Sequence, residues 1–224
     1  MTARAAIYYA PATDDPLWTA GCDWLGRDPQ TGSRTPRPDR DAFTEEARLY
    51  GFHATLKPPM RLARPWSALV DDAAALAARL APFALPPLAI GSLGNHGGGF
   101  LALRETVPCP ALNALADACV RELDSHRVPP DAAEIARRRK PGLTPEQDAM
   151  LLAWGYPHVL GTWRFHMTLT RRLTATERAA IQPQAEAQFA EALARPRRVE
   201  DICLYTQAEP GAPFMLAERL TLRG

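Results

Sequence analysis

The residues of this chain best suited to chemistry lie in two near-identical pentapeptides. Residues 52–56 read Phe-His-Ala-Thr-Leu, and residues 165–169 read Phe-His-Met-Thr-Leu. Because successive side chains of a strand point to opposite faces, the histidine and threonine of each copy share one face, and the apolar residues share the other. The sequence therefore predicts the same polar pair twice: an imidazole that can move a proton and a hydroxyl that can hold an oxygen.

The two histidines, His53 and His166, suit acid–base chemistry on a phosphodiester. One neutral imidazole can take a proton from an attacking hydroxyl or water, while the other, as imidazolium, gives a proton to the leaving oxygen. The hydroxyls of Thr55 and Thr168 can hold the non-bridging oxygens, on which charge builds during the reaction. This chemistry needs no cofactor, and the His-x-Thr spacing supplies too few ligands per strand for a metal.

Both motifs resemble the paired His-x-Thr-hydrophobic motifs of the 2H phosphoesterase superfamily, at residues 53–56 and 166–169. That superfamily includes 2′-5′ RNA ligase-like proteins and cyclic nucleotide phosphodiesterases. The resemblance implies a bilobal α+β fold and metal-independent hydrolysis of a phosphodiester, with His53 and His166 both catalytic.

Longer segments look like a bacterial branch of that superfamily that is associated with phosphonate metabolism, namely residues 50–57, 154–157 and 163–170. The branch implies a small phosphorylated substrate, such as a cyclic sugar phosphate formed during phosphonate breakdown. The predicted function is thus hydrolysis of a small cyclic phosphodiester. Two alternatives stay open: a 2′,3′-cyclic phosphodiesterase acting on RNA ends, and a protein that binds a phosphorylated metabolite without turnover.

The two motifs differ in the residues on their C-terminal side. Lys57 comes two residues after Thr55, which predicts a positive charge on the cleft face near the phosphate, although a solvated lysine at the end of a strand is an equal alternative. A lysine close to His53 would lower the pKa of that imidazole. This favours His53 as the base and His166 as the acid.

Apolar periodicity and turn signals predict the elements that position these residues. Besides the two His-x-Thr strands, strands are expected over residues 5–9, 88–93, 100–104, 201–206 and 214–222, and helices over residues 17–25, 66–83, 110–123, 146–154 and 174–194. A proline-bearing loop at residues 27–41 and an insertion at residues 128–147 interrupt this order. Either could gate a cleft.

The order of elements indicates an internal duplication. His53 and His166 are 113 residues apart, and the same offset carries the strand at 88–93 onto the strand at 201–206. We therefore predict one domain with a first repeat at about 5–94, a second at about 100–206 and a final strand at about 213–222. The expected fold is bilobal α+β, with duplicated strand–helix–strand–helix–strand units forming two antiparallel sheets around a central cleft.

Other motifs have an ordinary structural explanation beside a functional one. Residues 137–140, Arg-Arg-Arg-Lys, could contact RNA phosphates, but the exposed end of a helix is favoured. The glycines at 97–99 could cradle a phosphate, but a hairpin turn is favoured. Core packing or surface positions are likewise expected for the remaining aromatic and histidine side chains near the motifs, Trp154, Tyr156, Trp163, His96, His126 and His158.

Composition limits the classes of function. The 224 residues carry a net charge of +1, which disfavours a general nucleic-acid binder. No run approaches the ~18 apolar residues of a membrane span, and residues 1–16 lack the apolar stretch of a signal peptide. The four cysteines show no CxxC spacing. The sequence thus predicts a cytoplasmic bacterial hydrolase with no membrane partner, and it gives no indication of oligomeric state.

Overall fold

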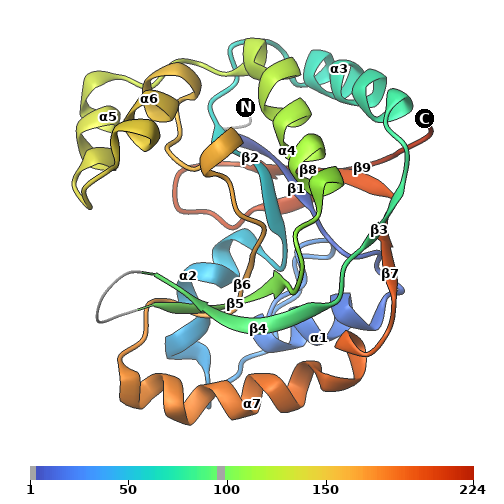
Figure 1. Ribbon diagram of the computed structural model, residues 1–224, viewed down its shortest axis with the longest axis vertical. Coiled ribbons are helices and arrows are strands. Elements are labelled where there is room, and N and C mark those ends of the chain that lie inside the picture. The colour runs from blue at the N-terminus through green and yellow to red at the C-terminus, as the bar shows by residue number, and fades with distance from the viewer. Residues whose placement is uncertain (1–3, 95–98) are drawn as a thin grey trace.

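The computed structural model of the protein describes residues 4–94 and 99–224. Within these residues, seven antiparallel strands form one sheet in the order β4-β5-β6-β2-β1-β8-β9, and β3 and β7 form a second, small sheet (Figure 1). The strands span Arg4–Tyr9 (β1), Ala54–Met60 (β2), Phe83–Leu85 (β3), Leu88–Leu93 (β4), Phe100–Glu105 (β5), Met167–Thr168 (β6), Arg197–Val199 (β7), Asp201–Gln207 (β8) and Met215–Thr221 (β9). The predicted antiparallel α+β class is confirmed, with one large sheet and one small sheet.

Four helices cover one face of the large sheet. Helices α3 and α4 pack over the half that contains β2, β1, β8 and β9, whereas α1 and α7 pack together, with α7 against β4 (Figure 1). Their apolar stripes join the apolar residues of both motifs in one core. The helices span Pro16–Leu25 (α1), Asp41–Tyr50 (α2), Trp66–Arg79 (α3), Pro110–Glu122 (α4), Ala132–Arg139 (α5), Pro145–Trp154 (α6) and Ala175–Leu193 (α7).

The strand order is symmetric about the seam between β6 and β2. Ala54 pairs with Met167 at this seam, and these two residues are the middle positions of the two motifs. On either side the order is the same, because β2-β1-β8 repeats β6-β5-β4. The third strand of each expected repeat thus pairs with the other repeat. The duplication itself stays a hypothesis, which this symmetry favours.

Some elements were not predicted. Helix α2 begins after Arg40, whose side chain makes no capping hydrogen bond, so the usual start signal is missing. Strands β3 and β7 have three residues each and pair with each other, too short to show periodicity. The expected turn at residues 94–99 falls largely outside the described residues.

The segment at residues 128–147 contains α5 and the first turn of α6, and both helices lie to one side of the sheet (Figure 1). The run of basic residues at 137–140 is the exposed C-terminal end of α5, as the helix-end interpretation predicted. A capping box at Thr144 and Gln147 starts α6. None of the helices in the described part of the chain is long and apolar enough to cross a membrane.

Candidate active site

The seam places the two polar pairs side by side on the face opposite the helices. Ala54 and Met167 are fully buried in the core beneath the sheet, so the flanking histidines and threonines point the other way. Continuing the antiparallel register from that pair sets His53 beside Thr168 and Thr55 beside His166. The two histidines are then diagonal neighbours, a relation with a spacing of roughly 7–8 Å.

His53 is held in place by its own segment and by β1. Its Nδ1 lies 2.9 Å from the carbonyl oxygen of Gly51, and its Nε2 lies 3.2 Å from Oγ1 of Thr55. The imidazole stacks on the ring of Tyr8, with 3.7 Å between the centroids. Because the Gly51 carbonyl can only accept, Nδ1 carries the proton, and Nε2 of the neutral ring accepts from the Thr55 hydroxyl.

His166 repeats this arrangement. Its Nδ1 lies 2.8 Å from the carbonyl oxygen of Arg164, again two residues earlier in the chain. The ring of Phe100 lies 5.7 Å from its imidazole. Among the described residues Nε2 of His166 has no hydrogen-bond partner. Both rings are thus fixed through Nδ1. The Nε2 lone pair of His166 is free, and that of His53 accepts from the Thr55 hydroxyl, which can rotate towards a ligand instead.

Burial lowers the pKa of both histidines. The pKa of His53 falls to about 4, mainly through desolvation, and the charge on His166 lowers it further. Desolvation also lowers the pKa of His166, and the charge of Arg104 adds to this effect. The effect of His166 on the pKa of His53 agrees with the closeness of the two imidazoles at the seam. Both rings are neutral near pH 7 in the unliganded protein.

A cavity of about 400 Å³ opens beside His53 and Thr168. Its wall combines polar, aromatic and cationic side chains, and its lining residues are Glu46, Ala47, Tyr50, His53, Phe100, Thr168, Thr170, Arg171 and Arg172. His166 does not line it. Thr170 is buried and accepts a hydrogen bond from the amide of Leu101. The volume suits a small ligand, because ligand pockets measure about 300–1,000 Å³.

Arg104 is a site residue that the sequence analysis missed. Ala102 pairs with Thr168 and Leu103 with Met167, so the register places Arg104 beside His166 on the same face. Its Nε is buried without a hydrogen-bond partner, and it forms no ion pair with any described residue. An unpaired guanidinium beside a candidate catalytic imidazole is well placed to meet negative charge.

Lys57 does not lie on this face, so the expectation that it neighbours the phosphate is wrong. Its Nζ is 2.9 Å from Oδ1 of Asp124 and 3.1 Å from the Val120 carbonyl, and its side chain is only 2% exposed. A β-bulge between Thr55 and Lys57 is the cause: the partners on β1 are Tyr8 and Ile7, one residue apart instead of two. The lysine therefore turns under the sheet towards α4.

The aromatic residues before the second motif separate into two kinds. Trp163 is buried, and its indole Nε1 donates to the carbonyl of Thr55, which ties this segment to β2. Tyr156 lies under the guanidinium of Arg138, with 4.9 Å from Cζ to the ring centroid. Desolvation lowers the pKa of His158, and the nearby charge of His166 lowers it further. No three His, Cys, Asp or Glu side chains among the described residues are arranged to hold a metal ion.

A family model described as "Protein of unknown function (DUF1045)" matches residues 55–215, well over half of the chain. The chain belongs to the DUF1045 family. Two relatives named ribose 1,5-bisphosphate phosphokinase PhnN align with almost all of this DUF1045 chain. The protein from Janthinobacterium sp. (strain Marseille) is 35% identical over 99% of the chain, and that from Laribacter hongkongensis (strain HLHK9) is 34% identical over 98%. The chain spans only 51% and 52% of these relatives, about half their length.

Solved structures also resemble this DUF1045 protein. Escherichia coli LigT in complex with 3′-AMP aligns over 100% of both chains, with a TM-score of 0.49 and 13% sequence identity.

Proposed function

We propose that this DUF1045 protein is a phosphodiesterase that hydrolyses a small cyclic phosphodiester by two-histidine acid–base catalysis. The observation that carries the proposal is the seam, where equivalent positions of the two motifs pair and set both imidazoles on one face. The matched Nδ1 contacts support it, because they hold a proton on each Nδ1 and make Nε2 the nitrogen of each ring that can exchange a proton. A protein that only bound phosphate would have no need of two such rings.

In the proposed reaction His53 is the base and His166 the acid. Nε2 of His53 takes a proton from water as the water oxygen bonds to phosphorus. The bond from phosphorus to the leaving oxygen breaks, and that oxygen takes the proton from Nε2 of a protonated His166. Thr55 and Thr168 donate hydrogen bonds to the non-bridging oxygens, and Arg104 offsets their growing charge. Afterwards His53 gives its proton to solvent and His166 regains one.

The pKa values support this division, although Lys57, which the sequence offered as the reason for it, lies elsewhere. The pKa of His53 is lowered to about 4, so His53 is the ring that stays unprotonated. The negative charge of a bound phosphodiester raises the pKa of a neighbouring imidazole. His166, the acid of the proposal, would gain its proton together with the substrate.

A small substrate is favoured over a long RNA. The cavity beside His53 has a volume of about 400 Å³, and the net charge of the chain is +1. The relatives that are twice as long carry a name that refers to ribose 1,5-bisphosphate, a small phosphorylated sugar. A cyclic sugar phosphate, as in phosphonate breakdown, is the substrate class that we propose.

Turnover of a panel of cyclic phosphates in the presence of EDTA tests the function. Wild-type protein should hydrolyse at least one member, and His53→Ala and His166→Ala should each lower kcat by about 10²–10⁴-fold. His126→Ala, which changes a buried histidine outside the site, is the matched control for loss of an imidazole. Binding without turnover across the panel would instead indicate a metabolite-binding protein.

An activated substrate separates the two histidines. A p-nitrophenyl phosphodiester has a leaving group that needs no proton, so it does not require the acid. We expect His166→Ala to retain most of its activity on this compound, whereas His53→Ala stays inactive. The opposite pattern would reverse the two assignments.

A further inference from the structure

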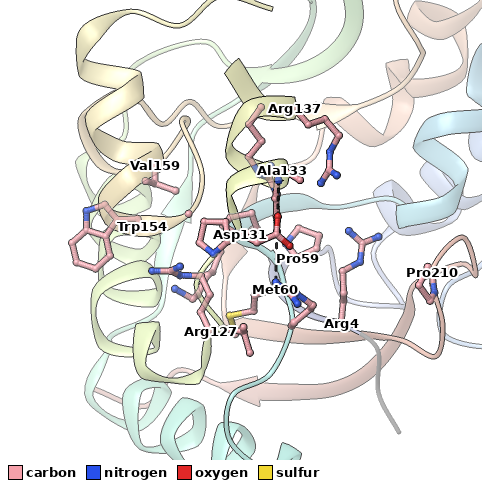
Figure 2. Close-up of a pocket in the computed structure, with 18 of the residues that line it drawn as sticks. Arg4, Pro59, Met60, Arg127, Asp131, Ala133, Arg137, Trp154, Val159 and Pro210 are labelled. Atoms are coloured by element: carbon pink, nitrogen blue, oxygen red, sulfur yellow. Dashed lines mark hydrogen bonds and ion pairs between the residues drawn. The ribbon is translucent and has the colours of Figure 1, made fainter. Parts of the chain in front are cut away.

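A second cavity, of about 460 Å³, lies between α5 and the ends of the central strands β1 and β2 (Figure 2). It is walled by the start of β1, the end of β2, the α5 segment and the turn between β8 and β9. Its floor includes the apolar residues Pro58, Pro59, Met60, Val128 and Val159. The two motifs contribute none of its lining residues, so this cavity is distinct from the one beside His53.

Positive charge dominates the wall of this cavity. Six cationic side chains line it, namely Arg4, Lys57, Arg61, Arg127, Arg137 and Arg138, against the carboxylates of Asp131 and Glu134. Lys57 and Arg127 both form ion pairs with Asp124. The Asp131 carboxylate caps α5 by accepting from the amide of Glu134. Of the remaining four arginines, Arg61 and Arg138 pair with Glu134, and neither Arg4 nor Arg137 forms an ion pair with any described residue.

Three of those arginines keep unused donors. Among the described residues, the Arg4 side chain hydrogen-bonds only to the neutral amide of Gln207, at 2.7 Å, and the Arg137 side chain has no hydrogen bond or ion pair. Arg138 uses one terminal nitrogen for Glu134, at 2.9 Å, while its Nε is buried without a partner. A buried, unpaired guanidinium donor is costly unless an anion takes it.

This cavity lies close to the candidate active site. Arg138 covers the ring of Tyr156. Burial raises the pKa of the Tyr8 hydroxyl, and Arg4 and Tyr156 lie near enough to affect that pKa as well. Tyr8 in turn stacks on His53, with the ring centroids 3.7 Å apart. Through Tyr156 and Tyr8 the arginines are thus neighbours of His53, and the proposal takes one ligand to span the two sites.

We propose that this cavity is a second anion site, in which Arg4, Arg137 and Arg138 hold a phosphate monoester carried by the substrate. Guanidinium groups recognise phosphate through paired, charge-assisted hydrogen bonds. The apolar floor suits the sugar that joins the two phosphorus groups. The inference rests on the proposed function, because it assumes that the other end of the ligand is the phosphodiester between the histidines.

The kinetic test compares adenosine 2′,3′-cyclic phosphate with the same compound bearing a 5′-phosphate. The ratio of kcat/KM for the two should favour the 5′-phosphate and should fall by about ten- to a hundredfold in Arg137→Gln. Arg137 is exposed, so the variant should fold. Lys140→Gln is the matched control, because it removes one charge from the same helix end but does not line the cavity. A ratio unchanged in Arg137→Gln overturns the proposal.

A binding measurement separates this proposal from the proposed function. Calorimetry with adenosine 5′-phosphate and adenosine needs no turnover, and Arg137→Gln should weaken binding of the phosphate only, while Lys140→Gln should not. If no cyclic compound is hydrolysed but this pattern holds, the function fails and the anion site stands. If the variant weakens binding without changing the kinetic ratio, the anion is a separate effector and the substrate-borne assignment is wrong.

Discussion

At the scale of single residues, the two histidines have unequal surroundings. Tyr8 stacks on His53, whereas Arg104 lies beside His166 in the register. The asymmetry between the proposed base and the proposed acid thus comes from the neighbouring strands β1 and β5. The pentapeptides themselves are almost identical.

Arg104→Gln should affect both the rate and its pH dependence. We expect kcat to fall by about ten- to a hundredfold, because a donor for the transition-state charge is lost. The charge of Arg104 lowers the pKa of His166, so its removal should raise that pKa and move the alkaline limb of the pH–rate profile to higher pH. Arg195→Gln, an exposed arginine on the surface of the protein, is the charge control. A lower rate with an unmoved limb would mean that Arg104 acts on the phosphate alone.

At the scale of elements, the bulge in β2 explains which predictions failed. Alternation held within each pentapeptide, so the faces of His53, Thr55, His166 and Thr168 could be predicted from the sequence alone. It failed one residue later, because a bulge depends on the partner strand and leaves no local signal. Arg104 was missed for a related reason, since its place beside His166 depends on the pairing of β5 with β6.

Lys57→Met should lower stability without a specific loss of activity. The substitution removes a buried amine and leaves the Asp124 carboxylate with Arg127 alone, which should cost about 1–3 kcal/mol in the free energy of unfolding. Urea denaturation measures this loss, and kcat of the folded variant should stay within about twofold. Asp124→Asn, which removes the carboxylate of the same ion pair, is the companion variant. A large fall in kcat at unchanged stability would mean that Lys57 contributes to the active site after all.

At the scale of the whole molecule, the buried imidazoles couple stability to pH. The unfolded chain protonates His53 near its ordinary pKa of about 6.5. The folded protein does so only at about 4. Between these values the unfolded state binds the extra proton, so the free energy of unfolding should fall as the pH falls from 6.5 to 4. The lowered pKa values of His158 and His166 act in the same direction.

His53→Gln should remove part of this pH dependence. Urea denaturation of the variant and the wild type at several pH values should give curves that converge as the pH falls towards 4. Parallel curves would mean that His53 titrates normally in the folded protein.

The third strand of each expected repeat pairs with the other repeat, and this pairing limits how the chain could be divided. Strand β4 pairs with β5, and β8 pairs with β1, so neither half of the sequence can complete its sheet by itself. Split between β4 and β5, the protein would yield two fragments, each with a strand edge shaped for the other. Produced together, they should reassemble into the native fold; produced singly, each should aggregate or pair with its own kind.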